Sequence, residues 1–229
     1  MTGHLQVLTR ATIEAGTKLK QANRNKSYDE ATKARQRIFD CVKEELGING
    51  AKNEKGSKLI VDPLDTEINY RRRGSAWAVH AGIFEEDKFV AGVIYLPETE
   101  VTISVEESST RLNGTRMTLD SEISPRDALV SVHTNLVEGI SRKGRKSLTL
   151  DELTREYAGL RLSGSLGADV CSMLKGEIDL LIVQNPDELT LIGLNVLLGA
   201  LAKTDLGPTK AILPHDLPIG IVRIGRIDF

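Results

Sequence analysis

The stretch that most constrains the fold is residues 59–70, where a short apolar run ends in two aspartates with a proline between them. Residues 59–61 have the β-branched, apolar character of a buried strand. Pro63 lacks a backbone N–H and fixes its φ angle, so a central strand must end there. We therefore predict a buried strand that releases the side chains of Asp62 and Asp65 at its tip, followed by a helix start.

Two carboxylates at a strand tip are typical of a site for a hard cation such as Mg²⁺, and the amides of a following helix N-terminus favour anions. Acids and proline are also ordinary turn residues. A polar turn at the end of a strand therefore explains the same Asp-Pro-Leu-Asp segment, and the residues alone leave both interpretations open.

The amino-acid composition argues against several classes of binding partner. The 229 residues are 40% hydrophobic and 27% charged, which is enough apolar material for one large core. With 30 basic and 32 acidic residues the net charge is −2, so no charge excess drives binding to nucleic acid or to a membrane surface. Aromatic residues make up only 4%, which argues against stacking on single strands.

Cysteine usage and the chain start favour a cytoplasmic location. Cys41 and Cys171 lie far apart and form no CxxC pair, which is typical of a reducing compartment without a disulfide framework. Residues 1–4 lack a basic-then-apolar signal pattern, and no apolar run reaches membrane-spanning length.

Helical periodicity predicts two antiparallel helices at the start of the chain, over residues 4–22 and 28–46, the second ending before Gly47. An antiparallel meander should follow, with a hairpin-type turn at residues 113–114. Its predicted strands cover residues 76–84, 89–96 and 99–105.

The second half alternates helices and strands, which indicates stacked α and β layers. The glycine-containing turn at residues 163–167 should open one of the helices, and His80 and His133 lie inside strand patterns, where we expect core or surface histidines rather than ligands. The predicted strands cover residues 129–133, 160–162, 178–183 and 219–224, and the predicted helices residues 148–157, 168–175 and 189–202.

The order of these segments resembles that of the inositol monophosphatase family. Residues 62–65, followed by Asn69 and Tyr70, resemble the family's DP(I/L)DGTxNF motif. Further similar segments are the hairpin at residues 74–97, the Asn-Gly turn at 111–114, the helix start at 164–169 and the Gly-x-(Ile/Leu)-Asp segment at 176–179. The resemblance extends from about residue 10 to residue 224.

The resemblance implies an α/β fold, namely a five-layer αβαβα sandwich. It implies one unit over residues 1–229, with the metal-motif layers in residues 1–125 and smaller αβ layers in residues 126–229. It further implies Mg²⁺-dependent hydrolysis of a small phosphate monoester, with two or three ions holding the phosphate and activating water. A small phosphorylated metabolite would be the ligand, and a homodimer the default assembly.

Carried over by position, the resemblance makes Asp62, Asp65 and the backbone carbonyl of Leu64 ligands of Mg²⁺. Asp65 would also approach the substrate hydroxyls. Thr66 and Asp169 fall where the family contacts its substrate, although an aspartate in a first helical turn is also a favourable partner of the helix dipole.

The chain departs from the family pattern directly after Asp65, where Thr66-Glu67 stands in place of Gly-Thr. Glu67 puts a negative charge where a phosphate should arrive. We predict either that Glu67 is a replacement ligand or catalytic base, or that it is a solvated residue in a site that has lost its metals.

The family's upstream Glu-Glu pair also lacks a clear counterpart. Glu44 and Glu45 lie at a similar distance from the motif but in the pattern of a helix end, and Glu54 lies in a short loop.

The family's downstream Trp-Asp pair has two candidate matches. Spacing from Asp179 puts Thr190 at the aspartate position, whereas matching on the proline puts Glu188 there and Asp187 at the tryptophan position. We prefer the second match, with Glu188 as a metal ligand and Asp187 as a substrate contact. Both acids also suit a simple helix-capping role.

Two functional hypotheses follow. The first is a Mg²⁺-dependent phosphomonoesterase acting on an inositol- or sugar-phosphate-like substrate. The second is a catalytically degenerate family member that keeps the sandwich as a binding or assembly module. They differ in whether the side chains of Asp62 and Asp65 converge with further carboxylates.

Overall fold

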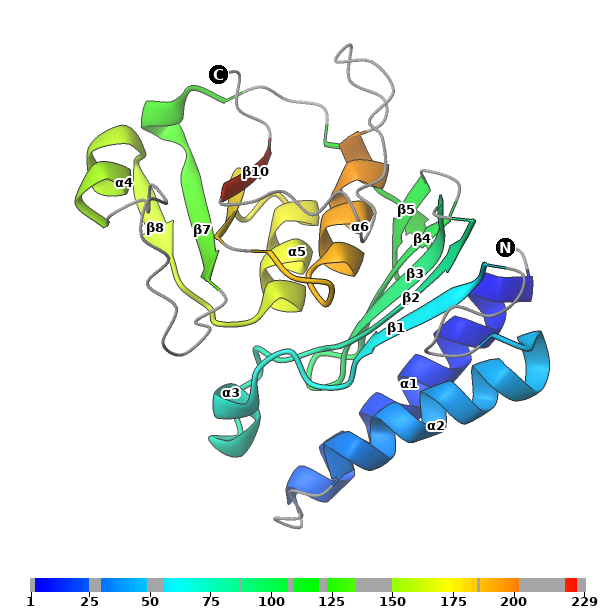
Figure 1. The fold of residues 1–229 in the computed structure, drawn as a ribbon. Coiled ribbons are helices and arrows are strands. Elements are labelled where there is room, and N and C mark those ends of the chain that lie inside the picture. Colours follow the sequence, from blue (N-terminus) through cyan, green and yellow to red (C-terminus); the bar gives the residue numbers. More distant parts are fainter. Residues whose placement is uncertain are drawn as a thin grey trace, which may run out of the picture.

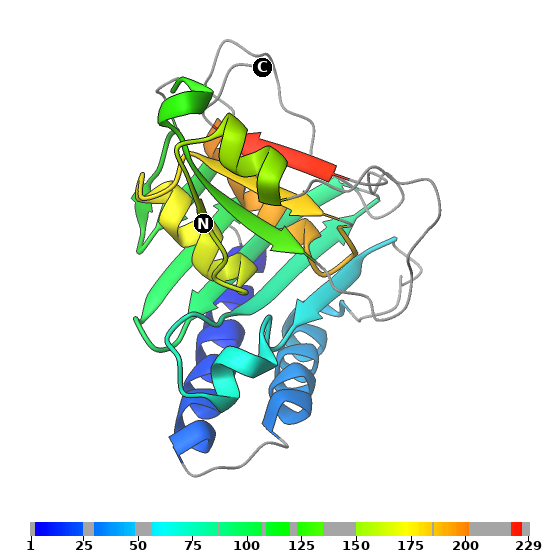
Figure 2. The same ribbon diagram turned by 90° about the vertical axis from the view of Figure 1, so that its left-hand side faces the viewer.

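Helices and sheets alternate in five layers across the molecule (Figure 1). The computed structural model describes residues 3–24, 30–48, 56–86, 88–106, 109–119, 123–134, 150–184, 186–201 and 221–225. The layers are helices α1 and α2, a six-stranded sheet, helices α5 and α6, a four-stranded sheet and helix α4. Figure 2 shows the same order from a second side. The predicted αβαβα sandwich is therefore confirmed.

Helices α1 (Gly3–Arg24) and α2 (Glu30–Leu46) cover one face of the larger sheet. Their apolar residues recur with the helical period and face the sheet, so both helices form where the periodicity predicts. Helix α2 ends at Leu46 and is followed by Gly47, whose φ is 69° and whose N–H donates to the carbonyl of Lys43 at 3.0 Å. Glycine adopts this left-handed conformation without a steric penalty.

The six-stranded sheet is a meander in which every strand pairs antiparallel with the next in sequence. Its strands are β1 (Lys58–Asp62), β2 (Val79–Glu85), β3 (Lys88–Leu96), β4 (Val101–Glu106), β5 (Ser109–Leu112) and β6 (Thr115–Arg116). The turn between β5 and β6 has positive φ angles at Asn113 and Gly114, as the predicted hairpin turn requires. The sequence pattern missed β5 and β6, which are short and largely polar.

Strand β2 begins three residues later than predicted. The backbone of Ala78 is held by Asp65, whose N–H donates to the Ala78 carbonyl at 3.1 Å. Ladder pairing with β3 starts only at Val79, opposite Tyr95.

Helices α5 (Leu166–Leu174) and α6 (Leu191–Leu201) form the middle layer. Helix α6 is apolar on all sides because it packs against the first sheet and against β10 of the second. Helix α5 starts two residues earlier than predicted, since Ser165 is its N-cap and the Ser165 hydroxyl accepts from the N–H of Ala168 at 3.1 Å.

The four-stranded sheet has the order β10-β9-β7-β8. Strand β7 (Leu129–Thr134) is parallel to β8 (Gly159–Arg161) and to β9 (Leu180–Gln184), and β10 (Ile221–Gly225) is antiparallel to β9. A short 3₁₀ turn (Pro125–Asp127) leads into β7. Helix α4 (Leu150–Glu156) contacts β8, and its Leu153 joins a separate buried cluster with residues of β7 and β9.

Helix α3 (Glu67–Arg71) follows the tip of β1 and is anchored to the first helix layer. The Tyr70 hydroxyl donates to the carbonyl of Leu19 at 3.0 Å, and the Asn23 side chain donates to the carbonyl of Tyr70 at 2.7 Å. The rings of Tyr70 and Trp77 meet edge to face, with their centroids 5.1 Å apart. These contacts fix the segment that carries the motif aspartates.

None of the helices in the described parts of the chain combines the length and the apolar character that a bilayer span requires.

Candidate carboxylate site

Strand β1 delivers Asp62 to the face of the first sheet that meets helices α5 and α6. Along β1, Leu59 and Val61 join the core under the first helix layer, whereas Ile60 joins the core of the middle layer. Because side chains alternate along a strand, Asp62 shares the face of Ile60. The strand register places Asp62 opposite His80 of β2. The sequence therefore correctly predicted a strand that ends in an acid.

The Asp62 carboxylate closes a local turn. Its Oδ1 accepts from the N–H of Leu64 at 3.2 Å, across the proline that ends the strand. Burial raises the pKa of Asp62 to about 6. The charge of His80 opposes this shift, whereas the negative charges of Asp65 and Asp187 add to it.

The Asp65 carboxylate is a buried centre of hydrogen bonding, with its side chain only 3% exposed. Its Oδ1 accepts from the N–H of Ala78 at 2.8 Å. Its Oδ2 accepts from the hydroxyl of Ser165 at 2.6 Å and from the N–H of Gly167 at 3.0 Å. Both oxygens are thus engaged by groups of the protein, and the carboxylate joins the start of β2 to the first turn of α5.

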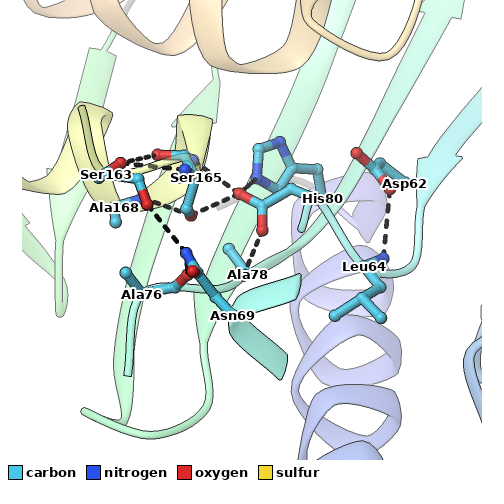
Figure 3. A network of polar contacts seen from close by, with 11 residues as sticks. Asp62, Leu64, Asn69, Ala76, Ala78, His80, Ser163, Ser165 and Ala168 are labelled. Atoms are coloured by element: carbon cyan, nitrogen blue, oxygen red, sulfur yellow. Dashed lines mark hydrogen bonds and ion pairs between the residues drawn. The ribbon is translucent and has the colours of Figure 1, made fainter. Parts of the chain in front are cut away.

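His80 adds a fourth partner to Asp65. The imidazole is completely buried, and its Nε2 lies 3.4 Å from Oδ2 of Asp65. This is an ion-pair contact, and neither ring nitrogen makes a well-aligned hydrogen bond in the described part of the chain. Burial acts to lower the pKa of His80, but the contact with Asp65 and the charges of Asp65 and Asp62 outweigh it, so the pKa is raised. In the view of Figure 3, His80 lies between Asp62 and Ser165.

Gly167 lets helix α5 approach β2 this closely. A Cβ atom at position 167 would stand 2.4 Å from Cβ of Ala78 and 2.8 Å from Nε2 of His80. No ordinary Cβ contact is that short. A side chain at this position would therefore push the first turn of α5 away from Asp65.

Asn69 ties the other side of the network together (Figure 3). Its side-chain amide donates to the carbonyl of Ala76 at 2.7 Å and to the carbonyl of Ser163 at 2.9 Å. The segment after β1 and the segment before α5 are thus joined by two separate links, Asn69 with Ser163 and Asp65 with Ser165.

Asp169 lies in α5 as a buried acid, 3% exposed. Burial raises the pKa of Asp169 to about 6, and the negative charge of Asp65 acts in the same direction. The hydroxyls of Ser163 and Ser131 and the charge of Arg161 act to lower this pKa. Its Oδ2 has no hydrogen-bond partner in the described part of the chain.

Glu67 and Thr66 lie at the start of α3. Glu67 is 62% exposed and forms an ion pair with Arg71 one turn later, at 2.5 Å. Thr66 is the N-cap residue of α3, but its side chain makes no capping hydrogen bond. The carboxylate of Glu67 is thus engaged at the surface of its own helix.

The two candidate matches for the downstream Trp-Asp pair fall in one turn before α6. Glu188 forms an ion pair with Lys58 of β1. Oδ1 of Asp187 accepts from the N–H of Thr190 at 3.0 Å, so Asp187 stabilises the turn locally. Thr190 is buried and directly precedes the helix.

The carboxylates described above do not fit a site for several Mg²⁺ ions. Such ions require several oxygen ligands each, mostly carboxylates. Both oxygens of Asp65 already bind protein donors, Glu188 faces Lys58, and the upstream candidate Glu45 pairs with Arg10. Glu54 lies outside the described residues. Within the described ranges, no three His, Cys, Asp or Glu side chains are grouped so as to hold a metal ion.

The sequence analysis named Asp62 and Asp65 as candidate site residues but did not predict the groups that contact them. His80 was expected to be a core or surface histidine rather than a ligand, and the structure buries it beside Asp65. Ser165 and Gly167 were noted only as part of a helix-opening turn. The available signal was the pairing of β1 with β2, which brings a histidine opposite an aspartate.

Comparison with known proteins gives a consistent result. The sequence matches the model of the inositol monophosphatase family over residues 8–188. It is 23% identical, over 146 residues, to a "Fructose-1,6-bisphosphatase/inositol-1-monophosphatase" of Aquifex aeolicus (strain VF5), covering 61% of this chain and 52% of that protein. The chain therefore spans about half the length of that relative.

A second relative is the "Inositol-1-monophosphatase" of Rhizobium meliloti (strain 1021), which is 24% identical over 198 residues, covering 76% of this chain and 74% of that protein. Among solved structures, the inositol monophosphatase from Anabaena (Nostoc) sp. PCC 7120 superposes with a TM-score of 0.76 at 19% identity, covering 97% of this chain and 90% of that one. The structural likeness establishes the shared fold, and the match to the family over most of the chain establishes its membership. The chain belongs to the inositol monophosphatase family.

Proposed function

We propose that this chain is a catalytically degenerate member of its family and acts as a binding or assembly module. The observation that carries the proposal is the set of contacts that the Asp65 carboxylate makes. In the first hypothesis this residue is a metal ligand, yet its two oxygens accept three hydrogen bonds from Ala78, Ser165 and Gly167 and also face His80.

Energetics support this assignment. A hydrogen bond to a charged group contributes about 1.5–3 kcal/mol, and leaving a buried donor unsatisfied costs a comparable amount. For Asp65 to turn toward a metal ion, it would have to give up contacts with Ser165 and Gly167. The first turn of α5 would then lose the group that satisfies its buried donors.

His80 supports the proposal through its charge. It is paired in register with Asp62 and lies in contact with Asp65, so a buried imidazole stands beside both motif aspartates. A cationic imidazole there balances part of the negative charge that a divalent cation would otherwise balance.

A second candidate function is Mg²⁺-dependent hydrolysis of a small phosphate monoester of the inositol or sugar phosphate class. Family membership favours it, since the two relatives named above are called phosphatases. The charges of Asp65 and Asp187 act on Asp62, so three acids lie in one region. If Mg²⁺ bound, Asp62 and Asp187 would be its nearest ligands, and the ion would supply charge for holding a phosphate.

A homodimer and a cytoplasmic location accompany either candidate as proposals. The homodimer follows from the family's habit, and the cytoplasmic location follows from the cysteine usage.

One experiment separates the two candidates. Thermal unfolding is followed with and without millimolar Mg²⁺, and phosphate release is measured from a panel of inositol and sugar phosphates. An ion that binds only the folded state at 100 times its Kd would add about 2.7 kcal/mol to the free energy of unfolding. We expect no Mg²⁺-dependent shift and no phosphate release. A shift that Asp62→Asn abolishes, together with phosphate release, would establish the hydrolase instead.

A further inference from the structure

The six-stranded sheet has an edge at β6, outside the carboxylate site. Strand β6 pairs with β5 and ends the order of this sheet in the described ranges. Figure 1 shows β5 at the side of the sheet opposite β1. An edge strand presents unpaired N–H and C=O groups, which a further strand can join.

Two arginines stand directly opposite each other at this edge. The strand register pairs Arg111 of β5 with Arg116 of β6. The N–H of Met117 donates to the carbonyl of Thr110 at 2.9 Å, so residues 110 and 117 form a hydrogen-bonded pair and residues 111 and 116 do not. Side chains come closest in a pair of the second kind, and the N–H and C=O groups of Arg116 then point away from β5.

Both arginines lie on the face of the sheet that carries α1. The opposite face holds Thr110, whose hydroxyl donates to the carbonyl of Val196 in α6 at 2.6 Å, and Leu112, which packs against the core of the middle layer. Side chains alternate along a strand, so Arg111 is on the face of α1, and its cross-strand neighbour Arg116 shares that face. Helix α1 covers the same face over β2, β3 and β4. Arg116 is exposed and Arg111 is half-buried.

The positive charges of this pair have no carboxylate partner within the described ranges. Arg111 donates to the carbonyl of Gly114 at 3.4 Å, and neither arginine forms an ion pair there. Like charges directly opposite on neighbouring strands destabilise a sheet, and an anionic group that binds both arginines removes this repulsion. Guanidinium groups bind carboxylates through two parallel N–H···O bonds. We call Arg111, Arg116 and the outward backbone groups of β6 the arginine edge.

We propose that the arginine edge binds an extended acidic segment of a partner protein as an added strand. The backbone of the segment pairs with the outward N–H and C=O groups of Arg116, and its carboxylates bind Arg111 and Arg116. In strand addition, main-chain hydrogen bonds supply affinity and the side chains at alternate positions supply specificity. The proposal gives the binding role a partner and so rests on the proposed function.

The same charges select against other partners. A neutral strand leaves the two arginines facing each other, and a basic strand or the arginine edge of another copy adds further like charge. A nucleic acid meets the arginines but cannot continue the ladder of main-chain hydrogen bonds. An acidic, extended polypeptide satisfies both the charges and the backbone groups of this edge.

The test is fluorescence anisotropy with short fluorescein-labelled peptides, in about 0.1 M salt, where charges more than about 10 Å apart are largely screened. The first peptide alternates glutamate with threonine, so that its carboxylates share one face of a strand. The second has glutamine in place of each glutamate. The third keeps every carboxylate but carries methyl groups on its central backbone nitrogens, which removes the donors needed for strand pairing. We expect the first peptide to bind, and each of the others to bind at least about tenfold more weakly.

Two charge-reversed chains locate the binding. Arg111→Glu with Arg116→Glu should weaken binding of the first peptide at least about tenfold. The matched control is Lys43→Glu with Arg155→Glu, which changes the net charge equally on the outer helices α2 and α4 and should bind like wild type. Circular dichroism checks the fold of each variant, and Arg116→Glu alone, at an exposed position, replaces the double variant if that one does not fold.

Several results would overturn the proposal. They are a wild type that does not bind the first peptide, equal losses in the control variant, equal binding of the methylated peptide, and displacement of the peptide by a single-stranded oligo-uridylate at the same concentration as by unlabelled peptide. Peptide binding is measured without Mg²⁺ or phosphate esters. The proposal can therefore fail while the Mg²⁺ experiment supports a non-catalytic role, and the reverse outcome is equally distinguishable.

Discussion

At the scale of single residues, the carboxylate of Asp65, which the family resemblance makes a metal ligand, accepts three hydrogen bonds from groups of the protein. A carboxylate that binds a metal in the folded protein is repelled by its fellow ligands when the metal is absent. A carboxylate that accepts three hydrogen bonds from buried donors instead stabilises the fold directly. The two roles predict opposite effects of removing its charge.

We predict that Asp65→Asn lowers the free energy of unfolding by about 2–4 kcal/mol, because the asparagine amide would face the donors of Ser165 and Gly167. The loss should be the same with and without Mg²⁺. Urea unfolding followed by the fluorescence of the single tryptophan, Trp77, measures it. Asp187→Asn is the control, since asparagine can still accept from Thr190. A gain in stability for Asp65→Asn would restore the interpretation of Asp65 as a metal ligand.

The buried acids also make stability depend on pH. The pKa of Asp62 and of Asp169 is about 6 in the folded protein, above the ordinary value of 3.8. Between these two values the folded state binds more protons than the unfolded state, so the free energy of unfolding falls as the pH rises toward 6. The raised pKa of His80 acts in the same direction at higher pH, since its stabilisation is lost as the pH rises through its folded pKa.

For Asp169 alone, this effect amounts to about 1 kcal/mol between about pH 5 and about pH 7. We predict that Asp169→Asn flattens the pH profile by that amount, since asparagine does not titrate. Urea unfolding across this range tests it. A variant whose profile matches that of wild type would show that Asp169 titrates normally in the folded protein.

At the scale of elements, the fold depends on how closely α5 lies on β2. Helix α5 begins beside Ala78 and His80 because residue 167 has no side chain. This approach brings the Ser165 hydroxyl and the Gly167 N–H within reach of Asp65.

We predict that Gly167→Ala destabilises the protein by about 1–3 kcal/mol, the usual cost of adding a methyl group to a filled interior. Helix propensity alone predicts a change of the opposite sign, since alanine is the better helix former. Gly3→Ala in α1 is the matched control, because a Cβ there meets nothing within 4 Å, and it should change stability by less than about 0.5 kcal/mol. Thermal unfolding of both variants distinguishes the two effects.

At the scale of the whole molecule, the middle helix layer joins the two sheets. One core cluster combines Ile94 and Ile103 of the first sheet, Leu191 and Leu197 of α6, and Leu181 of the second sheet. In the described part of the chain, this middle-layer core takes side chains from both halves, residues 1–125 and 126–229. We therefore propose that the chain behaves as one unit.

That proposal predicts a single unfolding transition. Trp77 lies in the core under the first helix layer and reports on that side of the molecule, whereas far-ultraviolet circular dichroism reports on all helices and strands. The two signals should change at the same urea concentration, as for a two-state domain. Two separate midpoints would mean that the halves unfold independently.

The sequence by itself determined the local features. The apolar run before Pro63 predicted β1, the period of α1 and α2 predicted the first layer, and Asn113-Gly114 predicted the hairpin. These features depend on neighbours within a few residues, so periodicity and turn chemistry are sufficient to find them. The ordered set of motifs likewise predicted the family and its layered fold.

Only the tertiary structure decided which groups the acidic side chains contact. Asp65 and Ser165 are 100 residues apart in sequence, and a hydrogen bond of 2.6 Å between them depends on how tightly two layers pack. The pairing of Glu188 with Lys58 likewise joins residues 130 positions apart. A motif states which side chains are present at a strand end, but hydrogen bonds and charges act over a few ångströms, so the partners are chosen by packing between distant segments.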